Sequence, residues 1–211
     1  MFTSPLVVLD FETTGLSPEE GDRITEVGAV RIHQGGVVER FQSLVNCGIQ
    51  VSRSITAYTG INQQMVDSAP PVSHVLRRLL AFIGNDAVVA HNARVDENFL
   101  RSECRRLELD LQLDPFICSM QLSRRVYPHL STHSLATLAW SLGLARTGAA
   151  HRAGADAELT AALMLRLGAD LAAQQPAEKL TPRMLRRMTQ RPAVELSLPV
   201  MQGMPGLMAF A

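Results

Sequence analysis

The chain has 211 residues, of which 46% are hydrophobic and 19% charged. This composition excludes an intrinsically disordered chain and fits one domain of ordinary size with an extension. Because 20 Lys and Arg balance 20 Asp and Glu, net charge gives no reason to expect nucleic-acid binding, which must come from a local site.

Three irregularly spaced cysteines, Cys47, Cys104 and Cys118, fit free thiols in a reducing compartment. The only early apolar run, Leu6 to Leu9, is too short for a signal peptide or a membrane span. We therefore expect a cytoplasmic location.

The first part of the chain predicts three strands. The run from Leu6 to Leu9 is typical of a buried strand that ends at Asp10, and residues 24–30 and 36–45 predict two more. The turn sequence Gln34-Gly35-Gly36 between the last two indicates a hairpin, so an antiparallel meander is expected.

The middle of the chain alternates helical and strand patterns. Helices are expected after Pro70-Pro71, around residues 99–107, around residues 135–142 and over residues 155–171, with strands at 87–90 and 115–118. Strands first and then strands alternating with helices predict an α/β domain, a mixed sheet flanked by helices. Trp140 and the leucines around it are expected to form a core-facing helix surface.

The composition changes near Ala173, where Gln174-Gln175-Pro176 breaks the last long helix. We therefore expect a domain over residues 1–172 and a C-terminal tail over residues 173–211. The tail is predicted to hold a short basic helix, Pro182 to Met188, and then an extended segment that is a candidate for partner binding.

Two carboxylates stand at the end of the first strand. Asp10 and Glu12 are two residues apart, so they point to one face of a strand while Phe11 points to the other. Carboxylates so close repel each other and are tolerated when a divalent cation neutralises them. The polar turn that follows, Thr13-Thr14-Gly15, allows an equally simple reading in which both acids are solvated.

Two further acidic residues open helices. Asp96 follows His91-Asn92 near the start of one predicted helix, and Asp156 follows His151-Arg152 at the start of the last long helix. Each is also explained by the helix dipole, which favours acidic residues in a first turn by roughly 0.3–1 kcal/mol. His91 is expected to order its loop.

These segments together resemble the three motifs of the DEDDh 3′–5′ exonuclease family, which includes the proofreading epsilon subunit of bacterial DNA polymerase III, ribonuclease T and oligoribonuclease. The matching stretches are Asp10 to Leu16, His91-Asn92 through Asp96, and His151-Arg152-Ala153 through Asp156; Thr59-Gly60-Ile61 is similar to the family's intervening segment. The resemblance spans roughly residues 5–172 and implies a ribonuclease-H-like fold.

The resemblance also implies a role for each residue of the site. Asp10, Glu12 and Asp156 would ligate one divalent ion, Asp10 would bridge to a second, and Asp96 would complete the cluster partly through water. His151 would be the general base, a role suited to histidine near neutral pH. All-oxygen ligands favour Mg²⁺ or Mn²⁺.

Substrate contacts are expected around the acidic cluster. Thr13 and Leu16, on the turn after Glu12, are candidates for the sugar and base of the terminal nucleotide, and Thr59 is a further one. Arg94 and Arg152 are either backbone-phosphate contacts or ordinary surface arginines.

Three functions remain open at this point. The leading one is an exonuclease acting on the 3′ end of a DNA strand, and the alternative is an exoribonuclease of the oligoribonuclease or ribonuclease T kind, which shares its chemistry. The third is a non-catalytic scaffold, against which the clustered carboxylates argue.

The tail contains Glu195-Leu196-Ser197-Leu198-Pro199-Val200, which resembles the Gln-Leu-x-Leu-Pro-Leu peptides that bind bacterial sliding clamps. Glu195 stands where that pattern has Gln. Leu196, Leu198 and Pro199 are therefore candidate contacts to a clamp or a DNA polymerase, unless the match arises by chance in an apolar tail.

Overall fold

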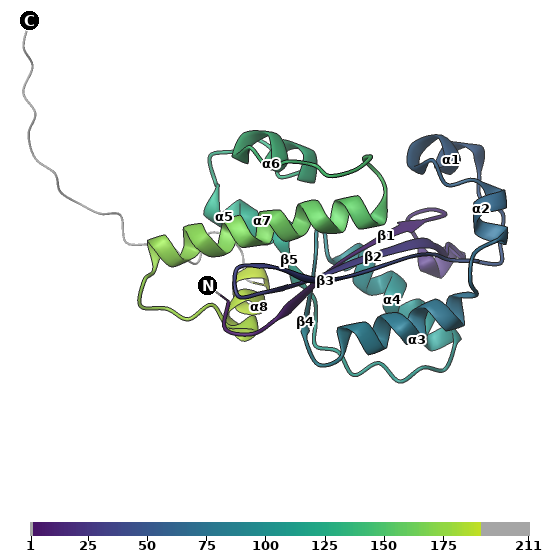
Figure 1. Cartoon of the computed structure of the whole chain (residues 1–211), viewed down its shortest axis with the longest axis horizontal. Coiled ribbons are helices and arrows are strands. Elements are labelled where there is room, and N and C mark those ends of the chain that lie inside the picture. The colour runs from purple at the N-terminus through teal and green to yellow at the C-terminus, as the bar shows by residue number, and fades with distance from the viewer. Residues whose placement is uncertain (1, 191–211) are drawn as a thin grey trace, which may run out of the picture.

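The computed structural model describes residues 2–190, which form one mixed sheet with helices on both of its faces (Figure 1). The strands are β1 (Leu6–Thr13), β2 (Ile24–His33), β3 (Gly36–Leu44), β4 (Ala87–Ala90) and β5 (Ile117–Cys118). Over this part of the chain the sheet order is β3-β2-β1-β4-β5, in which β1 to β3 pair antiparallel while β4 and β5 continue parallel to β1. The predicted α/β fold class is confirmed.

The helices connect and follow these strands. The 3₁₀ turn η1 (Pro18–Glu20) precedes β2, and α1 (Arg53–Thr59), α2 (Gln63–Asp67) and α3 (Val72–Ile83) precede β4. After β4 come α4 (Arg94–Arg106), β5, α5 (Ser119–Val126), α6 (Leu135–Leu142), α7 (Ala153–Gln174) and α8 (Pro182–Gln190). No helix among the described residues is both long enough and apolar enough to span a membrane.

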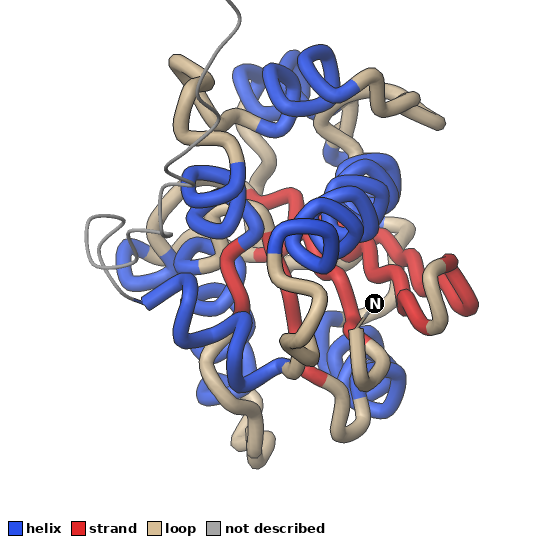
Figure 2. The backbone as a smooth tube through the Cα atoms, turned by 90° about the vertical axis from the view of Figure 1, so that its left-hand side faces the viewer, coloured by secondary structure: helices blue, strands red, loops and turns tan. Residues whose placement is uncertain are grey.

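The central strand β1 is buried on both faces. Its alternate residues Leu6 and Val8 belong to the core beneath α7, whereas Val7 and Leu9 belong to the core beneath α3 and α4. Figures 1 and 2 show α7 along one face of the sheet and other helices on the opposite side. Because strand side chains alternate with a period of two, residues 10 and 12 of β1 continue the row that faces α7.

The hairpin between β2 and β3 has the geometry that its sequence predicts. Gln34 and Gly35 form a two-residue connection, and both have positive φ values, 50° and 85°. Two successive residues of positive φ are characteristic of the type I′ turn, whose twist matches that of the flanking strands. The antiparallel meander of β1, β2 and β3 is confirmed.

The basic helix expected in the tail is α8, and it packs against α5 and β5. Leu185 is fully buried and joins the core beneath α7, as do Leu180 and Met188. The hydrophobic core therefore continues past residue 172, where composition placed the domain boundary. Residues 191–211, with the clamp-like segment, lie outside the described residues.

Trp140 is not a core residue, so that expectation is wrong. It is 86% exposed, whereas Leu138 in the same helix is fully buried. Two residues along an α-helix differ by about 200° in direction, so burying Leu138 turns Trp140 outward. The short helices α1 and α2 were also not predicted, because their polar sequences have little apolar periodicity.

The start of α7 approaches β2 at Gly28, the residue paired with Asp10 across the β1–β2 ladder. A Cβ atom built on Gly28 would lie 2.2 Å from the backbone of Ala153. Real side chains do not come that close, so only glycine permits this contact. The approach brings the first turn of α7 over the acidic end of β1.

We predict that Gly28→Ala destabilises the fold by about 1–3 kcal/mol or more, because the extra methyl group must push α7 away from the sheet. Urea unfolding measures this change. Gly36→Ala is the matched control, since a Cβ there meets nothing within 4 Å. Equal stability of the Gly28→Ala and Gly36→Ala variants would show that α7 does not depend on the close approach.

Candidate active site

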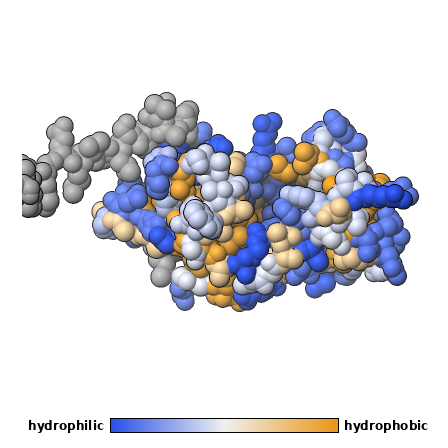
Figure 3. Space-filling view, turned by 90° about the horizontal axis from the view of Figure 1, so that it is seen from above, coloured by the Kyte–Doolittle hydropathy of each residue, from blue (hydrophilic) through white to orange (hydrophobic). Residues whose placement is uncertain are grey.

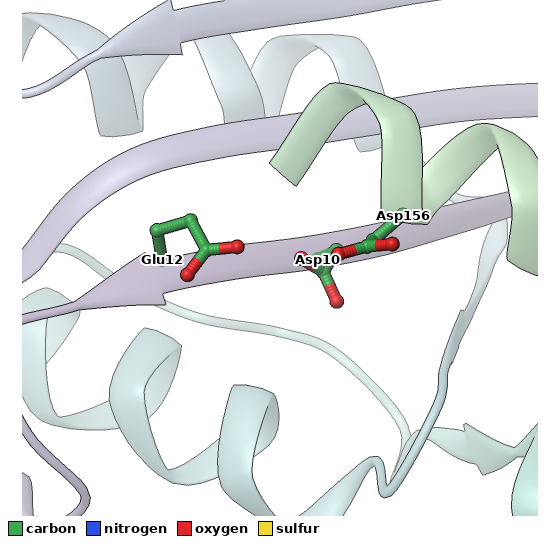
Figure 4. A group of neighbouring side chains, drawn as sticks. All are labelled: Asp10, Glu12 and Asp156. Atoms are coloured by element: carbon green, nitrogen blue, oxygen red, sulfur yellow. The ribbon is translucent and has the colours of Figure 1, made fainter. Parts of the chain in front are cut away.

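Three carboxylates meet where the end of β1 faces the first turn of α7. Ligand oxygens of Asp10, Glu12 and Asp156 all lie within 4.8 Å of one another. Figure 4 shows Asp10 and Asp156 directed toward each other, with Glu12 farther along the same strand. The strand supplies two carboxylates by its period of two, and the helix supplies the third from its first turn.

Asp96 reaches the same strand end from the first turn of α4. Its Oδ1 accepts a hydrogen bond of 3.1 Å from the backbone N–H of Phe11, and its side chain is buried. The partner strand β4 pairs with β1 only as far as Val8, so the Phe11 N–H needs another acceptor. Asp96 thus ties α4 to the strand that carries Asp10 and Glu12.

This crowding has an electrostatic cost. Burial, followed by the charges of Asp96, Glu12 and Asp156, raises the pKa of Asp10 well above its ordinary range. Burial, followed by the charge of Asp156, raises the pKa of Glu12 to about 7, and burial raises the pKa of Asp96 to about 7. Such a set of hard oxygen donors at short separations fits divalent cations, which would neutralise the repulsion.

Asp156 is held by its neighbours in the loop before α7. Arg146 donates a 2.5 Å hydrogen bond to Oδ1, and the backbone N–H of His151 donates to Oδ2 at 3.1 Å. The backbone of the predicted base, His151, is therefore hydrogen-bonded directly to a predicted metal ligand, Asp156. His151 itself has a positive φ of 59°, in the left-handed region.

A buried glutamate fixes the start of α7 to the sheet. Glu26 of β2 accepts two hydrogen bonds from the Arg152 guanidinium, at 3.0 and 2.7 Å, and one of 3.0 Å from the backbone N–H of Ala153. Burial favours the neutral acid, but these bonds and one from Gln42 outweigh it and lower the pKa of Glu26. Glu26 is therefore ionised directly opposite Glu12 in the β1–β2 ladder.

Glu26 was not recognised in the sequence, although a signal was present. A charged residue within the otherwise apolar stretch of Ile24 to Val30 needs a buried partner. Arg152 is that partner, so the Arg152 guanidinium is bound to the Glu26 carboxylate within the protein.

Asp22 shapes the turn after β1. Its carboxylate accepts hydrogen bonds from the Thr14 hydroxyl, at 3.1 Å, and from the Ser17 backbone N–H, at 3.0 Å. A Cβ on Gly15 would fall 2.3 Å from that carboxylate, so a larger residue there would displace the Asp22 side chain. The turn is thus a fixed structure beside Glu12.

The predicted substrate contacts differ in their surroundings. Leu16 lies on this turn with 86% of its side chain exposed, and the Thr13 hydroxyl donates to the carbonyl oxygen of Gly15. Thr59, in contrast, is buried; its hydroxyl donates to the Ile55 carbonyl at 2.9 Å and accepts from the Ile61 N–H at 3.1 Å. The Thr59 side chain fixes the end of α1, and its contact with a nucleotide stays a prediction.

His91 serves to order the second motif. Its ring hydrogen-bonds to the Ser119 hydroxyl at 2.9 Å and to the His133 carbonyl at 3.0 Å. Burial lowers the pKa of His91 to about 4, which keeps the ring neutral. The next residue, Asn92, adopts a left-handed conformation with φ 65° and turns the chain from β4 toward α4.

The face of the molecule that carries α6 and α7 mixes hydrophilic and apolar residues at short intervals (Figure 3). Exposed large apolar side chains near the site are scattered; they include Leu16 and Tyr58.

The chain is similar in sequence to known proteins. The chain is 38% identical over 167 residues to DNA polymerase III PolC-type of Oceanobacillus iheyensis, an alignment that covers 79% of this chain and 12% of the relative. It is 34% identical over 161 residues to the 3′-5′ exonuclease DinG of Bacillus subtilis, which covers 76% of this chain and 17% of the relative. The chain thus spans only a small part of the length of these two proteins.

The fold is shared as well. The solved structure of Exonuclease X in complex with 5′ overhanging duplex DNA superposes with a TM-score of 0.69 at 25% identity, covering 87% of this chain and 99% of that one. In addition, residues 7–164 match the family model RNase_T, described as an exonuclease family. Because this match covers most of its length, the chain belongs to the RNase_T exonuclease family, and the resemblance of its motifs to the DEDDh exonucleases is confirmed.

Proposed function

We propose that this protein is a divalent-metal-dependent 3′–5′ exonuclease that releases nucleoside monophosphates from the 3′ end of a DNA strand. The observation that carries the proposal is the set of carboxylates of Asp10, Glu12 and Asp156, whose ligand oxygens lie within 4.8 Å of one another. A scaffold has no use for this repulsive arrangement, whereas phosphodiester hydrolysis has.

The residues divide the work as follows. Asp10, Glu12 and Asp156 would hold Mg²⁺ or Mn²⁺, with Asp96 assisting from α4. Two such ions would lower the pKa of the attacking water and neutralise charge on the phosphate and the leaving 3′ oxygen. His151 accepts the proton of that water, and the hydrogen bond from its backbone to Asp156 keeps its loop beside the cluster.

The turn after β1 receives the terminal nucleotide in this proposal. Leu16, on the turn after Glu12, has an exposed apolar side chain that suits contact with a base. Thr13 directly follows Glu12 in the sequence, so we assign it to the sugar of the same nucleotide. DNA is favoured over RNA because the relatives named above include a DNA polymerase and a structure with bound DNA. RNA is the alternative substrate of the same chemistry, and a 2′-OH would be distinguished by the shape of this pocket.

The direct test is shortening of 5′-labelled single-stranded DNA and RNA of one sequence in Mg²⁺ or Mn²⁺. We predict stepwise loss of 3′ nucleotides, faster for DNA. Removal of the base in His151→Ala is expected to slow the reaction roughly 10²–10⁴-fold, and Asp10→Ala at least as much.

His74→Ala, which changes an exposed histidine of α3, is the control and is expected to match wild type. Faster digestion of RNA would transfer the proposal to an exoribonuclease. If neither polymer is shortened with metal present, the scaffold reading replaces the enzyme.

We further propose that the tail recruits the enzyme to a replication partner, a sliding clamp or a polymerase, in the cytoplasm. The support is the sequence Leu196-Ser197-Leu198-Pro199, whose alternate leucines suit insertion into an apolar pocket. The PolC-type relatives carry their matching domain within a DNA polymerase, which supports a polymerase as the other choice.

We predict that the wild-type chain binds a bacterial sliding clamp in surface plasmon resonance and that Leu196→Ala combined with Leu198→Ala abolishes this binding. Ser197→Ala is the matched control and is expected to bind normally. Clamp binding that survives the double substitution would remove the proposed contact.

A further inference from the structure

Tyr58 lies against the predicted base. Its ring and the imidazole of His151 have centroids 3.8 Å apart and planes inclined at 31°, although the two residues are far apart in sequence. Tyr58 is itself 60% exposed, so its ring does not contribute a buried core contact. Neither motif matching nor helical periodicity draws attention to this residue.

The ring of Tyr58 is carried on a firmly fixed helix end. The α1 helix begins at the N-cap Ser52, whose hydroxyl accepts a hydrogen bond from the Ile55 N–H, and ends at Gly60 with φ 74°. Next to Tyr58, Thr59 is buried and bonds to the Ile55 carbonyl, while Ile61 is fully buried. The backbone that carries Tyr58 is therefore well anchored beside the loop that carries His151.

The loop before α7, in contrast, has a conformation that needs outside support. His151 occupies the left-handed region, which residues other than glycine adopt at a cost. Its backbone N–H is bonded to Asp156. Within residues 2–190, however, no hydrogen bond is made by the imidazole, and Tyr58 provides its only ring contact.

We propose that Tyr58 is a positioning residue for His151, holding the imidazole by stacking so that both ring nitrogens stay available for proton transfer. This inference rests on the proposed exonuclease function with His151 as base. A stacked ring restrains the plane of the imidazole without engaging its nitrogens, which a hydrogen-bonding neighbour would occupy. Tyr58 thus acts through His151 and does not touch the reacting atoms.

The test compares the kcat and the KM of the full chain on 5′-labelled single-stranded DNA, measured over a range of DNA concentrations. We expect Tyr58→Ala to lower kcat roughly 3- to 10-fold with little change in KM, as loss of one aromatic pair would. Tyr58→Phe keeps the ring and is expected to restore kcat. Trp140→Ala removes another exposed aromatic residue, which lies in α6, and is expected to have no effect.

A double-mutant cycle separates this role from direct substrate binding. If Tyr58 works through His151, Tyr58→Ala has no further effect in the His151→Ala background. An equal loss in both backgrounds, or a loss seen only in KM, would mean that Tyr58 binds the nucleic acid and would overturn the proposal. Wild-type rates for Tyr58→Ala would overturn it as well.

A measurement without catalysis keeps the two proposals apart. In the metal-free protein, ¹H NMR should place the His151 ring protons upfield in wild type and Tyr58→Phe, and at ordinary positions in Tyr58→Ala. If wild-type protein is inactive but shows the upfield shift, the proposed exonuclease function is refuted while the contact between the Tyr58 and His151 rings is confirmed. Absence of the shift in wild type would refute the positioning role whatever the activity.

Discussion

The site depends on how closely the first turn of α7 can approach the sheet. Gly28 leaves room for the Ala153 backbone, and Glu26 binds the Arg152 guanidinium and the Ala153 N–H from the same strand. Charge-assisted bonds of this kind, largely removed from water, are among the stronger contacts a fold can make. They place Asp156 over Asp10, and without this docking the carboxylate of α7 would not meet the two carboxylates of β1.

The same docking sets the electrostatics. Glu26 faces Glu12 across the ladder and would repel it, but Arg152 supplies the compensating charge. No comparable cation is fixed between Asp10 and Glu12 in the described part of the chain, while Asp156 has Arg146. Burial, together with the repulsion that remains, raises the pKa of Asp10 and Glu12, and bound divalent ions would relieve this repulsion.

Much of this arrangement could be predicted from the sequence, for a physical reason. The period of two along β1 fixes that Asp10 and Glu12 share a face, and the turn residues Gln34 and Gly35 fix the hairpin. The strand pattern alone did not show which helix would face the two acids. That pairing was supplied by the resemblance to a family and is now seen in the proximity of Asp156.

What escaped prediction depends on contacts between distant segments. Glu26 looked like an acid in an apolar run, and its function appears only when Arg152 is placed beside it. Tyr58 lies in a short polar helix with no periodic signal, and Trp140 was assigned to the core although its neighbour Leu138 fills that position. The contribution of α8 to the core was hidden by the basic composition of its exposed side.

The most direct test of this account is Mn²⁺ binding, followed by electron paramagnetic resonance near pH 7.5. The account predicts that wild-type protein removes Mn²⁺ from the free signal saturably, that Asp10→Asn loses this binding, and that Asp110→Asn, at an exposed position, keeps it. A free Mn²⁺ signal that wild-type protein leaves unchanged, or equal binding by the Asp10→Asn variant, would contradict a metal site at the junction of β1 and α7.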